Sequence, residues 1–226
     1  GILSINAVTV TLSALSSMVK DKVSGRIHAI YTAPVSRLTI ASGYMLAAWA
    51  ASVWICVLTL LLTEIYGVIC GLEWFSLTTH LSLFGMILVN SFAYAAFMYA
   101  AAVLIHSEGA WSGMGTVIGT LTGFLGGIYL PIGELSQNVA NFMKCTPIIY
   151  GTSMFRNIMT KDILDITFSG IPEEAAAAYR EIVGIDLYVS GKQVTCTASL
   201  AVLLIFGVTF LMIGAAAIRH GNRTDR

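Results

Sequence analysis

Long apolar stretches alternate with short polar ones along the chain. A helix rises about 1.5 Å per residue, so roughly 20 apolar residues cross the hydrocarbon core of a bilayer. Backbone amides in lipid need hydrogen-bond partners within their own segment, so each such stretch is predicted to be a helix. The pattern therefore predicts an all-α fold, a polytopic transmembrane helical bundle, with residues 1–226 as a single transmembrane domain. The predicted spans are residues 1–18, 38–66, 77–105, 111–130 and 194–218.

Composition agrees with this pattern. Hydrophobic residues make up 57% of the chain and charged residues 11%, whereas a soluble domain carries about 25% charged residues. A soluble protein this apolar would expose large apolar patches and aggregate, but lipid is a suitable solvent for such an exterior. The formal net charge is zero, so no basic field indicates nucleic acid as a partner.

The basic residues are distributed unequally between the two sides of the predicted bundle. The loop 19–37 and the C-terminal tail together carry seven Lys and Arg residues, and the segment 131–193 carries five in a much longer stretch. Lys and Arg are enriched in short cytoplasmic loops, so loop 19–37 and the C-terminus are predicted to be cytoplasmic and segment 131–193 extracellular. Gly1 then lies outside, and we expect that the first of six spans is missing from this chain.

Apolar residues recur at helical spacing in loop 19–37, with basic residues on the other faces. The apolar positions are Val19, Val23, Ile27, Ile30 and Tyr31. This spacing predicts a short amphipathic helix that ends before Pro34, because the residue before a proline avoids the α region. Such a helix either lies in the lipid interface, with its basic side chains reaching the headgroups, or docks a cytoplasmic partner. The spacing favours neither.

Glycine recurs every fourth residue in the stretch 111–130, at Gly115, Gly119, Gly123 and Gly127. Small residues at this spacing form a flat stripe that lets two helix backbones approach closely. Packing within the bundle is the favoured interpretation, and a subunit interface or a sliding helix is the alternative. Gly127 also lies close to Pro131, which predicts a hinge at the outer end of this span.

The extracellular segment 131–193 contains further helical patterns. Residues 133–144 place Leu135, Val139, Phe142 and Met143 on one face, Pro147 interrupts the pattern, and residues 148–159 are again largely apolar. Neither piece is long enough to span, so together they predict a re-entrant helical hairpin that dips into the outer leaflet. Residues 172–181 predict a surface helix, with a proline at its start and acidic residues in its first turn.

Candidate chemistry is sparse. Asn6 and Asn90 lie within spans, and Glu64 lies near the outer end of its span. An ionisable group inside a membrane is often functional, but Glu64 is close enough to the end of its span to reach the interface, and this is the favoured interpretation. A Cys70–Cys145 disulfide is an alternative to free thiols. No phosphate-binding loop, nucleophile elbow or HExxH motif occurs, so we expect no catalytic or metal site and no enzyme activity in this chain.

Three stretches carry a resemblance to a known family. They are KVSGRIHAIYTAPVSRLTIASGYM (22–45), GTLTGFLGGIYLPIGELSQNVANFMKCTPIIYGTSMFRNIM (119–159) and YREIVGIDLYVSGK (179–192). They resemble the permease subunits of type-2 ABC transporters, of the multidrug type. The resemblance implies that two permease copies, or this chain and a paralogue, enclose a path through the membrane. It also implies that cytoplasmic ATP-binding cassette subunits dock on the loop and drive alternating access.

The resemblance assigns roles to particular residues. It implies an outer gate and re-entrant hinge at Phe124, Gly127, Tyr129, Pro131 and Pro147. It implies that the contact with the ATPase is made by Lys20, Lys22, Gly25, Arg26, Ile27, Tyr31 and Pro34.

The expected function follows from these assignments. The chain is expected to be a multi-pass protein of the bacterial plasma membrane that exports a drug, antibiotic or lipid-like compound. It is expected to hold no cofactor itself, since ATP and Mg²⁺ belong to the partner subunit. The alternatives are a proton-coupled secondary transporter that uses Glu64, and a membrane scaffold that transports nothing.

Overall fold

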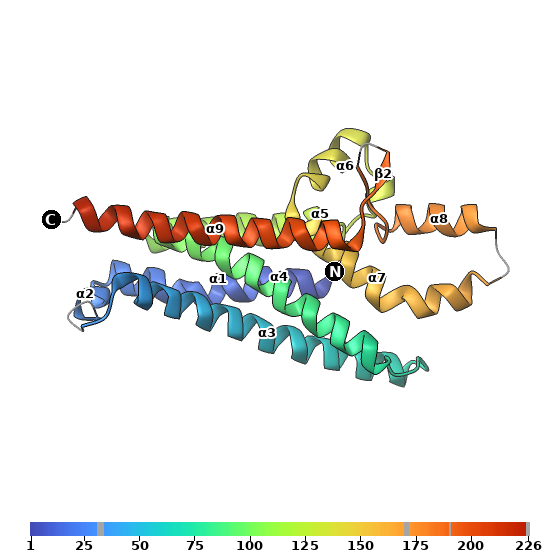
Figure 1. Ribbon diagram of the computed structural model, residues 1–226, viewed down its shortest axis with the longest axis horizontal. Coiled ribbons are helices and arrows are strands. Elements are labelled where there is room, and N and C mark those ends of the chain that lie inside the picture. The colour runs from blue at the N-terminus through green and yellow to red at the C-terminus, as the bar shows by residue number, and fades with distance from the viewer. Residues whose placement is uncertain (31–33, 170–171, 190, 225–226) are drawn as a thin grey trace.

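The computed structural model describes residues 1–30, 34–169, 172–189 and 191–224, and these are almost entirely helical. Five helices run along the length of the bundle (Figure 1), which confirms the all-α prediction. They are α1 (Ile2–Val23), α3 (Arg37–Ile69), α4 (Leu77–Leu104), α5 (Glu108–Leu125) and α9 (Cys196–Thr224). Within the described residues, α1, α3, α4 and the Cys196–His220 part of α9 are long and apolar enough to cross a membrane. By composition, α5 is not among them.

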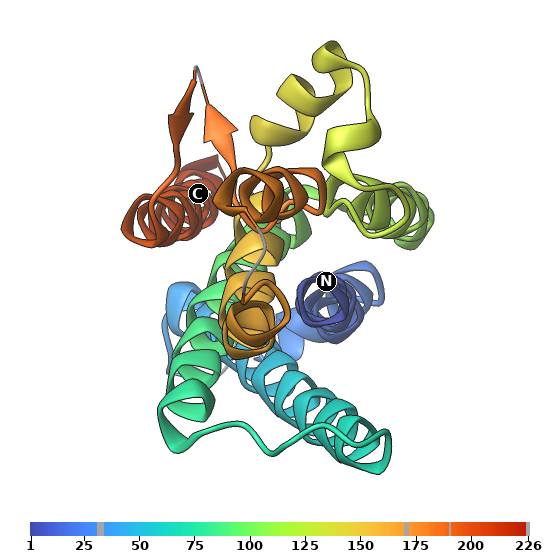
Figure 2. The same ribbon diagram turned by 90° about the vertical axis from the view of Figure 1, so that its right-hand side faces the viewer.

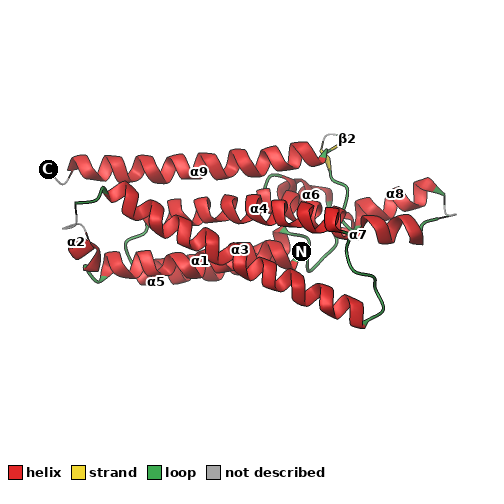
Figure 3. Cartoon of the chain, turned by 60° about the horizontal axis from the view of Figure 1, so that its bottom comes forward, coloured by secondary structure: helices red, strands yellow, loops and turns green. Residues whose placement is uncertain are grey.

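The connections gather at two ends of the bundle (Figures 1 and 3). One end holds the short helix α2 (Arg26–Ile30), the 105–107 turn between α4 and α5, and the end of α9. The opposite end holds the 70–76 turn, the start of α1 and the whole segment between α5 and α9. We call these the α2 end and the α7 end.

The central helix of the bundle is α4, which packs against α1, α3, α7 and α9. In its most apolar stretch of 18 residues, 61% of the residues are buried, whereas the corresponding share is 28% for α3 and 17% for α9. The outer faces of α3 and α9 expose large apolar side chains such as Trp54, Leu62 and Ile205. Such faces suit a lipid solvent, which accepts apolar side chains without the penalty that water imposes.

Hydroxyl side chains start the helices that follow the short turns. Ser36, Ser76, Ser107 and Thr195 each accept a hydrogen bond from a main-chain N–H three residues further on, at 3.0–3.2 Å. These N-caps satisfy amide groups that have no partner within the helix. They explain why α3, α4 and α9 begin within one or two residues of the predicted positions.

The predicted first span is longer than expected, and the predicted loop helix is broken. The helix α1 continues past residue 18 to Val23, so Lys20 and Lys22 lie in its last turn and not in a loop. A single helix through Val19, Val23 and Ile27 is therefore wrong. Gly25 adopts a φ of +75°, a conformation that side-chain-bearing residues rarely adopt, and it separates α1 from α2.

The predicted span 111–130 is also displaced: α5 begins at Glu108 and ends at Leu125. Its end is a Schellman motif, in which the N–H of Gly127 donates to the Phe124 carbonyl and the N–H of Ile128 to the Gly123 carbonyl. Gly127 has a φ of +62°, so it lies outside the helix. A glycine stripe that includes Gly127 on one helical face is therefore wrong.

Between α5 and α9 the chain forms several further elements at the α7 end. They are a 3-10 turn (Ile132–Glu134), α6 (Gln137–Lys144), α7 (Pro147–Thr167), α8 (Glu173–Ile182) and the paired strands β1 (Tyr188–Val189) and β2 (Lys192–Gln193). The helix predicted over 133–144 is thus interrupted at Leu135 and Ser136, and α7 is longer than the predicted stretch. Pro147 is the first residue of α7, and α8 confirms the predicted surface helix.

The first part of α7 lies inside the bundle, and its last part does not. Residues 148–155 are buried, and α7 packs against α1, α4 and α9. Figure 2, a view onto the α7 end, shows α7 and α8 between α9 on one side and α5 on the other. Both helices extend beyond the end of α9 in Figures 1 and 3.

Candidate functional site

A polar groove opens between α1 and α5 towards the α2 end. Its volume is about 560 Å³, and Gly115 of α5 is part of its lining. A Cβ atom on Gly115 would lie 2.9 Å from Cδ2 of Leu12 on α1, so the missing side chain permits this approach. The polar lining consists of Ser13, Ser16 and Lys20 from α1, and Glu108, Ser112 and Thr116 from α5. Two helices of an otherwise apolar bundle thus present hydroxyl and charged groups to a common space.

The residues proposed to contact an ATPase are not all accessible. Lys20, Arg26 and Pro34 are exposed, whereas Ile27 is 6% exposed and packs inside the chain. Gly25 is half-buried and forms the turn between α1 and α2. Tyr31 lies outside the described residues.

Lys22 binds within the chain. Its Nζ donates hydrogen bonds to the carbonyl oxygens of Ala102 (2.9 Å) and Val103 (2.8 Å) in the last turn of α4, and of its C-cap residue Ile105 (3.0 Å). A cation at the C-terminus of a helix satisfies carbonyls that lack helical partners and interacts favourably with the helix dipole. The ammonium group of Lys22 therefore caps α4. Nearby, the Tyr44 hydroxyl donates to Asp21 Oδ2 at 2.6 Å, which ties α1 to α3.

The predicted outer gate is a compact turn after α5. The rings of Phe124 and Tyr129 meet edge to face, with centroids 5.1 Å apart, and both side chains are largely exposed. Tyr129 folds back over Gly123, where an added Cβ would lie 2.8 Å from the tyrosine oxygen and closer still to its ring. Pro131 follows directly and leads into the 3-10 turn, whereas Pro147 lies further along, at the start of α7.

The glycines of the predicted stripe have different surroundings. Gly115 faces α1 and Gly123 lies under Tyr129, but an added Cβ on Gly119 would meet nothing within 4 Å. Within this chain the stripe is therefore not one continuous contact with another helix.

Arg156 of α7 joins the ends of two other helices. Its guanidinium donates to the carbonyls of Gly127 (2.7 Å) and Gly126 (3.4 Å) after α5, and to the carbonyl of Val183 (2.8 Å) after α8. The planar guanidinium can make both sets of bonds at once, because its N–H groups point in fixed, diverging directions. One side chain thus caps α5 and α8. Close by, a hydrogen bond to the carboxylate of Asp186 raises the pKa of Arg180 above its ordinary value.

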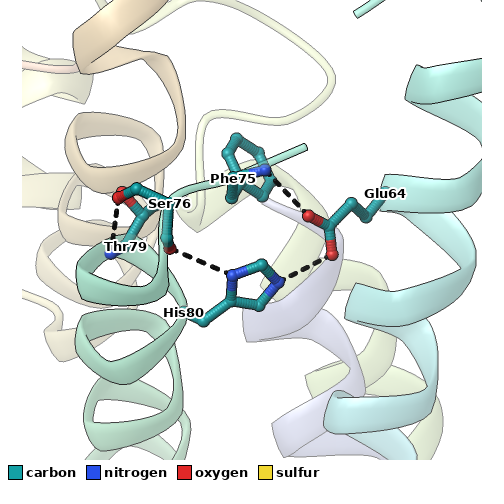
Figure 4. A network of polar contacts seen from close by, with 5 residues as sticks. All are labelled: Glu64, Phe75, Ser76, Thr79 and His80. Carbon is teal, nitrogen blue, oxygen red and sulfur yellow. Dashed lines mark hydrogen bonds and ion pairs between the residues drawn. The ribbon is translucent and has the colours of Figure 1, made fainter. Parts of the chain in front are cut away.

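Glu64 and His80 form a buried contact across the hairpin between α3 and α4 (Figure 4). Glu64 Oε2 lies 2.9 Å from His80 Nε2, and Oε1 accepts a hydrogen bond from the Phe75 N–H at 2.9 Å. The Glu64 side chain is 2% exposed and that of His80 is 33% exposed. The carboxylate of Glu64 therefore binds within the chain, beside the turn that joins α3 to α4. That it lies at the membrane interface stays a prediction.

The hydrogen bonds define how many protons this pair holds. His80 Nδ1 lies 3.0 Å from the Ser76 carbonyl, which can only accept, so Nδ1 carries a proton. The second contact then contains one proton between Nε2 and Glu64. The pair is either imidazolium and carboxylate or two neutral groups, and its net charge is zero in both forms. A net charge of zero lowers the free-energy cost of burying the pair in a low-dielectric environment.

Sequence reasoning missed His80, although a signal existed. Glu64 and His80 lie within about one and a half turns of the two helix ends that the 70–76 turn joins. Side chains that flank a tight hairpin at such positions can meet. All four cysteines are free, so no disulfide joins Cys70 to Cys145.

Apolar helices of membrane-spanning length define the chain as a multi-pass membrane protein. It belongs to the ABC-2 family of transporter proteins, since the family model described as ABC-2 family transporter protein matches residues 1–216. The chain is therefore an ABC transporter permease, the membrane component and not the catalytic one, and permeases of this family work with an ATP-binding subunit. None of the curated proteins matches it. The resemblance seen in the sequence is confirmed for the family.

Proposed function

We propose that this permease exports an amphiphilic compound, of the drug, antibiotic or lipid-like class, out across the bacterial plasma membrane. The groove between α1 and α5 carries this proposal. Its lining combines hydroxyl groups, one Lys and one Glu with the apolar faces of Leu12, Val19 and Trp111. A ligand site of this kind suits a molecule with an apolar body and a small polar part.

The proposed direction of transport depends on orientation. The α2 end holds residues 19–30 and 34–37 and the end of α9, and the Lys and Arg residues of these segments favour the cytoplasm. The groove opens towards this end, where it would receive a compound from the cytoplasm or the inner leaflet. In this arrangement α5 is the fifth span: its 18 residues correspond to about 27 Å, and its one charged residue, Glu108, lies in its first turn.

The path would be completed by a second permease copy or a paralogue. Val117, Leu121 and Phe124 on α5 are exposed large apolar residues, and the groove beside them is open on one side. A facing copy would cover them and enclose the groove. Phe124 and Tyr129 would then close the path at the α7 end, and residues 148–155 would dip into the outer leaflet as the proposed re-entrant part.

The ATP-binding subunit would dock at the α2 end on the accessible members of the predicted set, which are Lys20, Arg26 and Pro34. Arg26→Glu tests this contact, because Arg26 is exposed and its side chain is not needed to cap α4. We expect co-purification of the ATPase to fall about tenfold, the loss expected for a rim charge pair turned into a repulsion. The matched control is Lys192→Glu at the α7 end. Equal ATPase recovery with both variants would contradict the docking assignment.

The groove is tested with the full-length permease and its ATPase reconstituted in liposomes. Ser112→Trp places a large ring in the groove, and we expect it to abolish the stimulation of ATP hydrolysis by amphiphilic compounds. The control is Thr209→Trp, a hydroxyl residue on the exposed face of α9. Stimulation that is the same in both variants would place the path elsewhere.

Proton-coupled secondary transport is the second candidate, and the buried Glu64–His80 pair is the observation that favours it. The pair already satisfies its own hydrogen bonds and closes a hairpin, which supports a structural role. Transport that continues in Glu64→Gln and stops when ATP is removed would exclude proton coupling through this pair. Transport without ATP that Glu64→Gln abolishes would support it.

A further inference from the structure

Several buried polar atoms on α1, α4 and α7 have no hydrogen-bond partner within the described part of the chain. The atoms are Ser4 Oγ on α1, Asn90 Oδ1 and Nδ2 and Tyr94 Oη on α4, and Thr152 Oγ1 on α7. Ser4, Asn90 and Thr152 are 0% exposed. Native proteins contain few such atoms, and each one calls for a physical explanation.

Two of these side chains meet at one point on α7. A Cβ atom added to Gly151 would lie 2.5 Å from Asn90 Oδ1 and 3.6 Å from Ser4 Oγ. Any larger residue at this position would therefore displace the Asn90 carboxamide. Gly151 lets α7 approach α4 and α1 so closely that an amide and a hydroxyl share the space beside its backbone.

Elsewhere in the bundle, polar side chains pair directly. Ser52 donates to Ser91 at 2.9 Å between α3 and α4, and Asn6 donates to Thr59 at 2.7 Å between α1 and α3. The helix pairs α1–α3 and α3–α4 thus satisfy these interior polar groups without help. The unpaired side chains of Ser4 and Asn90 lie on the sides of α1 and α4 that contact α7 at Gly151.

The occupant of this site must be small. Asn90 has no accessible surface even in the isolated chain, so neither a second permease copy nor an ATP-binding subunit can reach it. The carboxamide offers donors and acceptors and the serine hydroxyl offers both, without a formal charge. Water matches this set, because it donates and accepts at once and is held inside proteins by two to four polar partners.

We propose that Ser4, Asn90 and the backbone beside Gly151 form an interior binding site for water between α1, α4 and α7. Hydrogen bonds through water can exchange without repacking side chains. The site therefore connects α7 to α1 and α4 through hydrogen bonds that can exchange when α7 shifts. Arg156, on the same helix, binds the ends of α5 and α8, so a small shift of α7 is passed to the outer turn.

The direct test is solid-state NMR of the full-length permease in lipid bilayers, with water as the probe. Transfer of magnetisation from water protons to the side-chain amide of Asn90 is expected, with the signal assigned by its loss in Asn90→Leu. The matched control is the Asn6 amide, which already donates to Thr59. Water contact at Asn90 but not at Asn6 supports the site, and absence of water contact at Asn90 overturns it.

Two variants test the other members of the site. Ser4→Ala removes one partner of the water, and we expect the Asn90–water signal to fall about fivefold, since a hydrogen bond of ordinary net strength changes a binding constant by roughly that factor. Gly151→Ala is expected to remove the signal altogether. If the protein does not fold with alanine at 151, the Ser4→Ala result decides. An unchanged signal in Ser4→Ala overturns the proposed site.

Discussion

The ammonium group of Lys22 lies 2.8 Å from the carbonyl oxygen of Val103 and caps the last turn of α4 from the neighbouring helix α1. The contact joins the α2 end of the central helix to α1, the helix that precedes α2. A residue that the family resemblance implicates in ATPase docking is thus engaged within the permease itself. Charge reversal at Lys22 would disturb this cap as well as any docking surface, which is why Arg26 is the better test of docking.

Lys22→Met should destabilise the protein by about 1–2 kcal/mol, because three carbonyls lose a charged donor while the apolar stem is kept. The measurement is thermal unfolding of the permease in lipid nanodiscs. The control is Lys20→Met in the same helical turn, where the side chain is exposed and little change is expected. Equal losses in the two variants would contradict the cap.

His80→Ala should cost about 2 kcal/mol, since it leaves the buried Oε2 atom of Glu64 without its hydrogen-bond partner. Glu64→Gln in the same background should restore much of the stability, because the amide carries no charge and still accepts from the Phe75 N–H. Chemical denaturation of the single and double variants in detergent measures both effects. His106→Ala, in the exposed turn between α4 and α5, serves as the control. Additive losses would show that the two residues act independently.

Arg156→Lys should loosen two distant turns together. An ammonium group cannot reproduce the diverging bonds to Gly127 and Val183, so a loss of about 1–2 kcal/mol is expected. Hydrogen–deuterium exchange should rise both in residues 126–131 and in residues 183–187. Lys161→Met, on the exposed part of α7, should change neither. Faster exchange in only one of the two segments would mean that Arg156 does not join them.

The glycines of α5 should respond differently to alanine. Gly119→Ala meets nothing within 4 Å and should stabilise the helix by up to about 1 kcal/mol. Gly123→Ala should displace Tyr129 and break its contact with Phe124, at a cost of about 1 kcal/mol. Thermal unfolding of the two variants compares them directly. The same response at both positions would argue against the packing of Tyr129 on Gly123.

Much of the fold was predictable from the sequence. The spans 38–66 and 77–105 correspond to α3 and α4 within a few residues, because lipid requires long apolar helices and the serine caps at residues 36 and 76 define their starts. The predicted ends were less accurate where backbone conformation decided them. Gly25 and Gly127 end α1 and α5 through positive φ angles, whereas hydropathy alone extends or shortens the spans.

The candidate site was predictable only in part. The chain order of Phe124, Tyr129 and Pro131 indicated an outer turn, and the basic loop indicated the α2 end. The roles of Lys22 and Arg156 were not predictable, because both bind main-chain carbonyls, which every residue possesses and which leave no mark in a sequence. Asn90 was recognised as a polar residue in a span, but its position opposite Gly151 required the packing of α7.

The amino-acid sequence is sufficient for the membrane class, the helical fold and the family, since these depend on local apolar length, local hydrogen bonding and motif. Tertiary structure decides which charged and polar groups meet. It pairs Glu64 with His80, places Lys22 on α4 and gathers Ser4 and Asn90 beside α7. The physical reason is that a buried polar group must find a partner wherever the helices bring one within about 3 Å, and that distance depends on packing between segments far apart in the chain.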